Sequence, residues 1–137
     1  VPGKRPRTTL SPSLALKDGK PFMVFGTPGG DQQDQWSALM FLHHADHRMN
    51  LQESIDCPAF HTDHFPSSFW PRASQSKKVV LEGRFPDSTI AELRRRGHDI
   101  EIGEPWSEGR LTAASSDGAI LKAAANARGM QGYAAGR

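Results

Sequence analysis

The sequence predicts an α+β fold in which a strand hairpin, a helix and a long loop precede a strand-helix-strand unit. Apolar residues recur with a period of two in some segments and with a helical period in others. Gly contributes 13 and Pro 10 of the 137 residues, and this share exceeds the average of roughly 12% for the pair. Such a composition favours a loop-rich fold over a helical bundle. The sequence contains no internal repeat or linker that would divide it into two domains.

The N-terminal part is predicted to form a β-hairpin. Residues 8–16 are extended, because Pro12 disfavours helix and the leucines fall on one side of a two-residue period. The Asp18-Gly19 pair between two apolar runs is a strong hairpin signal. The returning strand, residues 21–25, is almost continuously apolar, which predicts burial on both of its faces.

Two helices are predicted next. The first covers residues 31–49 and begins at Asp31, a residue type that caps helices by accepting backbone N–H groups. Its broad apolar stripe comprises Trp36, Leu39, Met40, Leu42 and His43. The second helix runs from a cap at Asn50 to residue 56. Residues 59–76 are rich in aromatic residues, Ser and Pro without a period, and are predicted to be a long ordered loop or a covering segment.

The second half is predicted to contain a strand-helix-strand unit followed by a strand pair. Gly97 suits the left-handed end of a helix, and Ser116-Asp117-Gly118 is a turn signal. The elements are a strand over 78–81, a helix over 86–97, a strand over 99–102 and paired strands over 111–114 and 119–123. A Gly-rich, irregular tail completes the chain.

Charge and hydropathy exclude several classes of function. A formal net charge of +2 is too small to indicate binding to nucleic acid or to an anionic membrane surface. No apolar run approaches the roughly 18 residues that span a bilayer. The single cysteine, Cys57, excludes an internal disulfide. Because the chain opens without Met or a hydrophobic segment, we interpret it as part of a longer precursor, whose localisation this N-terminus does not reveal.

The segment with the most chemistry is FGTPGGDQQDQW, residues 25–36. Two glycines between a buried strand and a helix start let two backbone N–H groups point at one anion. The helix N-terminus adds a partial positive charge at the same place. Such a pair of donors, at Gly29 and Gly30, suits an oxyanion hole. Considered without other information, a simple turn is the more common meaning of this pattern.

A longer stretch resembles a known family. Residues 5–30, RPRTTLSPSLALKDGKPFMVFGTPGG, are similar to a segment in the small subunit of gamma-glutamyltranspeptidases. In that family an R-P-x-[ST]-[ST]-M-S-P-T-like segment leads through a K-D-G-x hairpin to a [ST]-P-G-G loop. Further resemblance lies in three later segments, NLQESIDCPAFHTDH, IAELRRRGHDIEI and AAANARGMQGYAAGR. The resemblance thus covers essentially the whole chain.

The resemblance implies a fold and a reaction. The family is built as a four-layer α-β-β-α sandwich of the N-terminal-nucleophile hydrolases. It cleaves gamma-glutamyl amides such as glutathione and transfers the acyl group to water or an amine, without a metal or organic cofactor. The resemblance places the hydroxyl pair that binds the donor α-carboxylate at Thr8 and Thr9. It places the oxyanion-hole glycines at Gly29 and Gly30.

The nucleophile of the family is a Thr freed by autocleavage, and it lies upstream of the matching segment. Residues 1–137 are therefore predicted to be a C-terminal segment that lacks the nucleophile and is inactive alone. The implied partners are the upstream part of the same precursor, meaning the large subunit and the nucleophile segment, and a small gamma-glutamyl or related amide. Neither nucleic acid nor a membrane is expected, and a homo-oligomer is left open.

Three positions depart from the family pattern. Phe60 stands in place of an Arg, Asn126 in place of an Asp and Ala127 in place of a Pro. These differences leave the acyl donor open. One alternative is an amidase of the same fold with another donor, similar to cephalosporin acylase. Another is a non-catalytic binding fragment that descends from the same fold.

Other residues also invite a functional interpretation. His43 and His47 share one helix face and could ligate a metal, but no third ligand is evident and ordinary helix-face histidines are the more common case. Cys57 could act as a nucleophile with His61 or His64 as its base, although an isolated buried cysteine is usually inert. The aromatic and Ser-rich stretch over residues 65–70 suits either a lid or a surface that packs on the upstream chain.

Overall fold

The computed structural model describes residues 1–6, 8–130 and 132–136, which form two β-sheets and three α-helices. The larger sheet is antiparallel, with the strand order β1-β2-β6-β7. Its strands are β1 (Ser13–Lys17), β2 (Lys20–Gly26), β6 (Thr112–Ser116) and β7 (Leu121–Ala125). The smaller sheet has the order β3-β4-β5, with β3 (Phe60–Thr62), β4 (Lys78–Glu82) and β5 (Asp99–Gly103).

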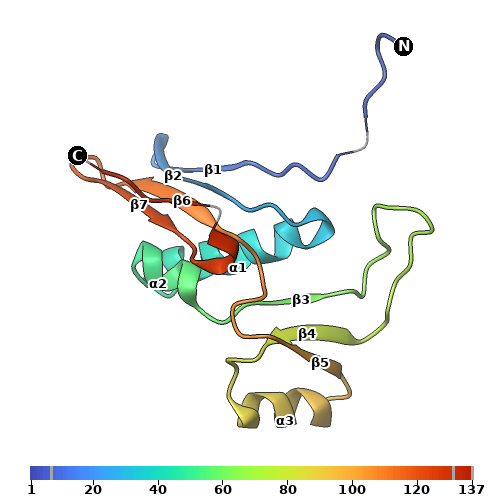
Figure 1. Ribbon diagram of the computed structural model, residues 1–137. Coiled ribbons are helices and arrows are strands. Elements are labelled where there is room, and N and C mark those ends of the chain that lie inside the picture. Colours follow the sequence, from blue (N-terminus) through green and yellow to red (C-terminus); the bar gives the residue numbers. More distant parts are fainter. Residues whose placement is uncertain (7, 131, 137) are drawn as a thin grey trace.

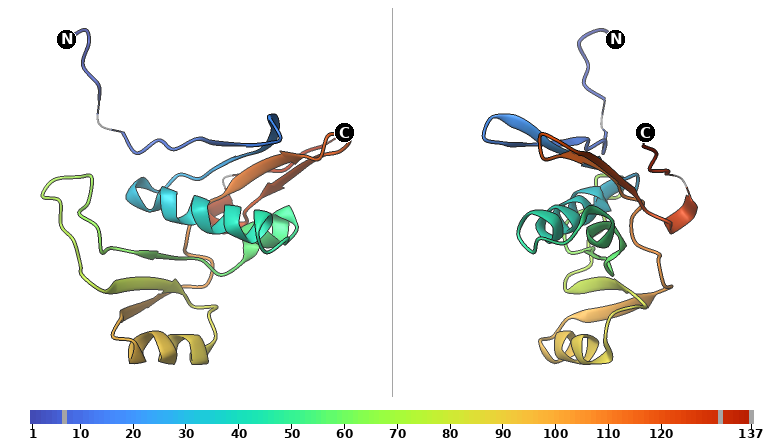
Figure 2. Two further views of the ribbon diagram at one scale, coloured as in Figure 1. Left: turned by 180° about the vertical axis from the view of Figure 1, so that it is seen from behind. Right: turned by 90° about the vertical axis from the view of Figure 1, so that its left-hand side faces the viewer.

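The helices α1 (Gln33–Ala45) and α2 (Leu51–Asp56) lie between the two sheets (Figure 1). Helix α3 (Asp87–Arg95) connects the parallel strands β4 and β5 and covers the far side of the smaller sheet (Figure 2). The main core joins the larger sheet to α1 and α2. It comprises Met23, Trp36, Met40, Leu51, Ile55, Ala59, Leu111, Ala113 and Ala124. The chain is thus a mixed α/β fold.

One face of the larger sheet packs on the helices, and the other is open in this chain. Along β2, Met23 is buried whereas the next residue, Val24, is 48% exposed. Leu14 and Leu16 on β1 are also exposed. The prediction that the strand over 21–25 is buried on both faces is therefore wrong for the chain as it stands. A continuous apolar run has here produced a strand with one covered face.

Three of the local signals for turns and caps are confirmed. Asp18 and Gly19 both have positive φ angles, 51° and 75°, as the tightest hairpin turns require. Asn50 caps α2 by accepting from the backbone N–H of Glu53, and the Glu53 carboxylate accepts from the backbone N–H of Asn50. Gly97, with φ at 90°, follows α3 as predicted.

The predicted start and end of the first helix are wrong. A 3-10 turn, η1 (Gly30–Gln32), precedes α1, and Gln32 occupies the N-cap position without a side-chain bond. Asp31 is not the cap, because its carboxylate accepts hydrogen bonds from Ser67 and Ser68 instead. Arg48 has a positive φ of 58°, and this conformation is incompatible with a helix running to residue 49.

The long loop predicted over residues 59–76 contains a strand. The three residues of β3 pair with β4, matching Phe60 to Leu81, His61 to Val80 and Thr62 to Val79. The segment is too short and too polar to show a strand period in the sequence. A second 3-10 turn, η2 (Arg128–Met130), lies in the tail that was predicted to be irregular. Within the described ranges, none of the helices has the length and apolar character needed to cross a bilayer.

Candidate functional site

A polar pocket of about 560 Å³ brings together three of the four predicted site residues, Thr8, Thr9 and Gly30. One side is formed by these residues and by the start of α1, and the other by the β3–β4 loop, residues 63–77. The remaining lining residues are Asp31, Gln32, Asp34, Gln35, Thr62, Asp63, Phe65, Pro66, Ser67, Ser68, Ala73, Ser74 and Gln75. Hydroxyl, amide and carboxylate groups dominate this surface.

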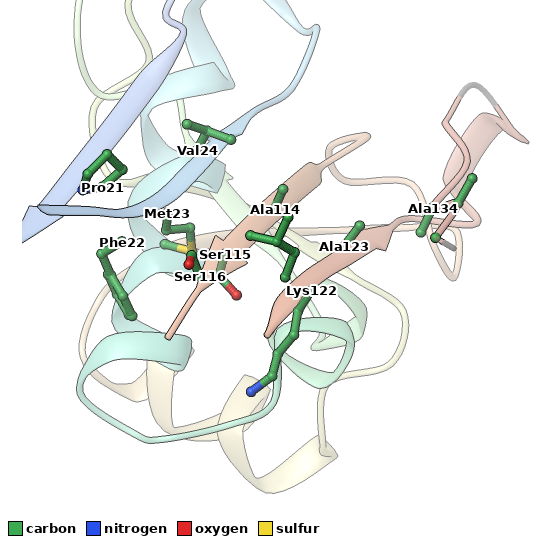
Figure 3. Close-up of a pocket in the computed structure, with 13 residues that line it drawn as sticks. Pro21, Phe22, Met23, Val24, Ala114, Ser115, Ser116, Lys122, Ala123 and Ala134 are labelled. Carbon is green, nitrogen blue, oxygen red and sulfur yellow. The ribbon is translucent and has the colours of Figure 1, made fainter. Parts of the chain in front are cut away.

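A larger pocket of about 720 Å³ lies elsewhere, over β2, β6, β7 and the C-terminal segment (Figure 3). It contains none of the predicted site residues. Lys122 is the single charged residue among the described residues that line it, and most of the others are apolar. It belongs to the open face of the larger sheet. We therefore take the smaller, polar pocket as the candidate site.

The glycine loop has a backbone that other residues would not tolerate. Gly29 has φ at 143° and Gly30 at 64°, both in the region that favours glycine. A Cβ atom at Gly29 would lie 2.2 Å from Cζ3 of Trp36, so the indole ring packs directly against this residue. The ring is fixed in turn, because its Nε1–H donates to the Glu108 carboxylate at 2.9 Å.

Gln33, in the first turn of α1, connects the two predicted site segments. Its amide is buried, with 7% of the residue exposed. In the amide orientation that satisfies both terminal atoms, Nε2 donates to the carbonyl oxygens of Thr9 (3.1 Å) and Thr27 (3.0 Å). In the same orientation Oε1 accepts from the N–H of Gly30 at 3.0 Å. The N–H of Gly30 is therefore directed at Gln33 in this structure.

The sequence did not lead us to predict Gln33 as a site residue. A helical period places it on the same face as Trp36, Ser37 and Met40, all of which are buried. The predicted apolar stripe did not include Gln33, and it did include Leu42, which is 44% exposed. A buried polar side chain on an inner helix face must find partners. That requirement is the signal that could have identified Gln33.

The β3–β4 loop is attached to the glycine loop. Oδ2 of Asp31 accepts from Oγ of Ser67 at 2.9 Å and from the backbone N–H of Ser68 at 2.7 Å. The ring of Phe69 approaches Gly30, since a Cβ atom there would lie 3.9 Å from its Cε2. These contacts place residues 67–69 beside the predicted oxyanion segment.

A buried ionic cluster lies at the junction of the two sheets and is centred on Glu82, which is completely buried. Its carboxylate accepts from Nη2 of Arg128 at 2.8 Å, from Nη2 of Arg84 at 2.7 Å and from the backbone N–H groups of Ala59 and Glu108. Burial by itself raises the pKa of Glu82, but these hydrogen bonds outweigh it and hold the pKa below the ordinary value.

The residues that depart from the family pattern lie away from the pocket. Phe60 is on β3, where its ring contacts that of Phe85 with centroids 6.3 Å apart. Asn126 is buried, and its Oδ1 accepts from the backbone N–H of Arg128. Neither these two residues nor Ala127 lines the pocket. Phe60 and Asn126 thus contact other residues of the chain, whereas Ala127 is exposed.

The rival metal site lacks a ligand set. The rings of His43 and His47 lie edge to face with centroids 6.1 Å apart. Within residues 1–6, 8–130 and 132–136, no group of three or more His, Cys, Asp and Glu side chains is arranged to hold a metal ion.

The Cys57 thiol lies against a methionine, and His61 is paired with a carboxylate. Sγ of Cys57 contacts Sδ of Met49 at 3.6 Å, while Nδ1 of His61 is paired with the Glu108 carboxylate at 2.5 Å. Burial raises the pKa of the Cys57 thiol, even though the charges of Arg84 and Arg128 oppose this effect. A raised pKa lowers the thiolate fraction, which is the nucleophilic form.

Comparisons with known proteins agree on one family. The family model described as Gamma-glutamyltranspeptidase matches residues 1–136. The oxamate amidohydrolase proenzyme of Klebsiella pneumoniae is 41% identical over 123 residues, which are 89% of this chain and 21% of that protein. The glutathione hydrolase proenzyme of Escherichia coli K12 is 27% identical over 122 residues, with 89% and 19% covered.

Two solved structures also match. One, named LmbA2991HD, has a TM-score of 0.93 and 55% identity, covering 100% of this chain and 25% of that one. The cephalosporin acylase of Bacillus halodurans has a TM-score of 0.77 and 27% identity, covering 93% and 22%. The chain thus spans about a fifth of the curated relatives named above. On the match over residues 1–136, the chain belongs to the gamma-glutamyltranspeptidase family.

Proposed function

We propose that this chain is the C-terminal portion of an amide-cleaving enzyme of the gamma-glutamyltranspeptidase family. The observation that carries the proposal is the single pocket that Thr8, Thr9 and Gly30 share. A Thr nucleophile from an upstream segment of the same precursor would enter this pocket. The open apolar face of the larger sheet, which includes Leu14, Leu16 and Val24, would pack on that segment to complete a four-layer sandwich.

In the proposed reaction the Thr hydroxyl attacks the amide carbonyl and forms an ester. Its proton passes to the α-amine of the Thr and then to the leaving amine, as in other N-terminal nucleophiles. The backbone N–H groups of Gly29 and Gly30 hold the oxyanion, and the N–H of Gly30 exchanges its bond to Gln33 for one to the substrate. Loss of one such donor typically costs about 10²–10³ in rate. Water or an amine then cleaves the ester.

The proposed donor is a small amide that also carries a carboxylate. The hydroxyl groups of Thr8 and Thr9 can donate hydrogen bonds to a carboxylate. A gamma-glutamyl amide such as glutathione meets this description. So does oxamate, which we propose as the second candidate because the 41% identical relative is named an oxamate amidohydrolase. An acylase donor and a non-catalytic binding role are the remaining alternatives.

The test compares the full-length gene product with residues 1–137 alone. The assays are release of p-nitroaniline from gamma-glutamyl-p-nitroanilide and release of ammonia from oxamate. We expect activity on at least one donor in the full-length protein, none in the short chain, and loss of activity in Gly29→Pro and Gly30→Pro variants. Gly118→Ala is the control for replacing a glycine at a positive φ, because Gly118 has φ at 93° but no atom within 4 Å of its Cβ position.

Each outcome has a distinct meaning. Turnover of oxamate without turnover of the anilide would assign the second donor. A folded, autocleaved full-length protein that acts on neither donor would support an acylase donor or a binding role. Activity in residues 1–137 alone would refute the proposal that the nucleophile comes from an upstream segment.

A further inference from the structure

We propose that the β3–β4 loop determines donor specificity, and that Phe65 binds the apolar part of donors larger than oxamate. This inference rests on the proposed function and deepens it by assigning a role to the wall opposite Thr8, Thr9 and Gly30. The loop supplies eight of the residues that line the pocket: Asp63, Phe65, Pro66, Ser67, Ser68, Ala73, Ser74 and Gln75. It therefore faces any ligand that the hydroxyl pair would hold.

Hydrogen bonds fix the β3–β4 loop both internally and to the opposite side of the pocket. Within the loop, the N–H of Ser67 donates to the carbonyl of Ala73 at 2.9 Å and that of Gln75 to Asp63 at 2.8 Å. Across the pocket, Oδ2 of Asp31 accepts the two bonds from Ser67 and Ser68. Hydrogen bonds to a carboxylate are about twice as strong as neutral ones. The loop thus keeps a defined position next to Gly30.

Phe65 is the single aromatic residue among the described residues that line the pocket. Its ring is held edge to face by the ring of His64, with centroids 5.7 Å apart. Phe65 is also 72% exposed, so a ligand can reach its ring. Because the carboxylate of the donor would lie at Thr8 and Thr9, the ring meets the part of a ligand that extends away from them. Oxamate has no apolar part that the ring could bind.

Phe69 and Trp70 have different roles in this arrangement. The Phe69 ring lies next to Gly30 and helps to hold the β3–β4 loop against the glycine loop. Trp70 is 90% exposed and does not line the pocket. Trp70 therefore offers a matched control for Phe65, since both are exposed aromatic residues of one loop. A packing role of the loop against the upstream chain predicts the larger effect at Trp70.

The experiment measures Phe65→Ala and Trp70→Ala in the full-length, autocleaved protein. KM is measured for gamma-glutamyl-p-nitroanilide and for oxamate where they turn over, and Kd by calorimetry where they bind without turnover. We expect Phe65→Ala to raise KM or Kd for the anilide about tenfold, as loss of one apolar pocket contact does. The KM or Kd of Phe65→Ala for oxamate should stay within about twofold of the wild-type value. Trp70→Ala should leave the values for both ligands unchanged. Ser67→Ala removes the hydrogen bond to Asp31 that holds the loop in position, and should raise the KM or Kd for the anilide by a smaller factor.

Failure of this inference and failure of the proposed function give different results. Turnover by the wild type with equal effects of Phe65→Ala and Trp70→Ala overturns the inference and leaves the function standing. Binding of the anilide with turnover of neither ligand overturns the function, while the anilide Kd values of the Phe65→Ala and Trp70→Ala variants still decide the role of Phe65. Absence of both binding and turnover for both ligands overturns the two together.

Discussion

The carboxylate of Glu82 and the guanidinium of Arg128 form a two-pronged ion pair from which solvent is excluded. Nη2 of Arg128 lies 2.8 Å from Oε2 of Glu82, Nε donates to Oε1, and the two side chains are 1% and 0% exposed. Glu82 belongs to the smaller sheet, and Arg128 follows the last strand of the larger one. The pair therefore joins the two sheets, which share no strand pairing.

Replacing Arg128 should destabilise the protein strongly. Arg128→Met leaves the Glu82 charge buried without its two-pronged partner, and breaking a buried pair in this way typically costs about 3–5 kcal/mol. The effect should appear as a lowered midpoint in thermal unfolding of the full-length protein. Arg95→Met is the matched control, because Arg95 pairs with Glu92 on the exposed surface of α3 and such pairs contribute little. Equal shifts in the two variants would contradict the special role of the buried pair.

Acid should weaken the same junction. The pKa of Glu82 lies below its ordinary value of 4.5 in the folded chain, so the unfolded chain takes up the proton more readily. The stabilising contribution is therefore complete above about pH 4.5 and is lost as the pH falls further towards the folded pKa. The difference in stability between the wild type and Glu82→Gln should be largest near neutral pH and should shrink in acid. Unfolding midpoints measured in a pH series test this.

Glu92 provides the control for the pH series. Hydrogen bonds from Arg95 and Arg96 lower its pKa to about 2, but the group is exposed on α3 and salt screens its interactions. The contribution of Glu92, measured with Glu92→Gln, should therefore diminish at high ionic strength. That of Glu82 should persist there. A Glu82 difference that salt removes, or that does not vary with pH, would refute the assignment.

Gly29 should be far less replaceable than other glycines of similar conformation. Gly29→Ala places a methyl group 2.2 Å from the Trp36 ring in a backbone with φ at 143°. Gly97→Ala is the comparison, since Gly97 has φ at 90° but no atom within 4 Å of its Cβ position. A left-handed alanine costs about 1–2 kcal/mol, which Gly97→Ala should show as a lowered unfolding midpoint with activity kept. Gly29→Ala should lose activity on the donor by about 10²-fold or more. Full activity in Gly29→Ala would refute the role of this loop.

The elements that could be predicted from the sequence are those specified by neighbouring residues. The Asp18-Gly19 turn, the cap formed by Asn50 and Glu53, and the glycine end of α3 each depend on contacts within four residues. The strands β4 to β7 were also predicted to within three residues at each end, because turn signals bound them. Contacts between neighbouring residues decide such features.

Features that depend on distant partners could not be predicted in this way. Asp31 is a residue type that commonly caps helices. Its carboxylate instead accepts hydrogen bonds from Ser67 and Ser68, which lie 36 and 37 positions later in the chain. The pairing of Glu82 with Arg128 spans 46 positions and has no local pattern. Burial of Gln33 depends on Thr9, Thr27 and Gly30 converging on its amide. The gathering of Thr8, Thr9 and Gly30 at one pocket was expected from the resemblance alone, and the roles of these residues stay a prediction.

Cys57 should be chemically inert and dispensable for activity. Burial raises the pKa of its thiol above the ordinary value of 9.0, so the reactive thiolate should be scarce at pH 7.5. We expect iodoacetamide to alkylate the native full-length protein much more slowly than it alkylates the protein unfolded in urea, as measured by mass spectrometry. Cys57→Ala should keep amide cleavage within about twofold, since no transition-state contact is removed. Replacing the Thr at the upstream autocleavage site should abolish activity. The reverse pattern, with Cys57→Ala inactive and the Thr variant active, would make Cys57 the nucleophile and would move the chemistry into this chain.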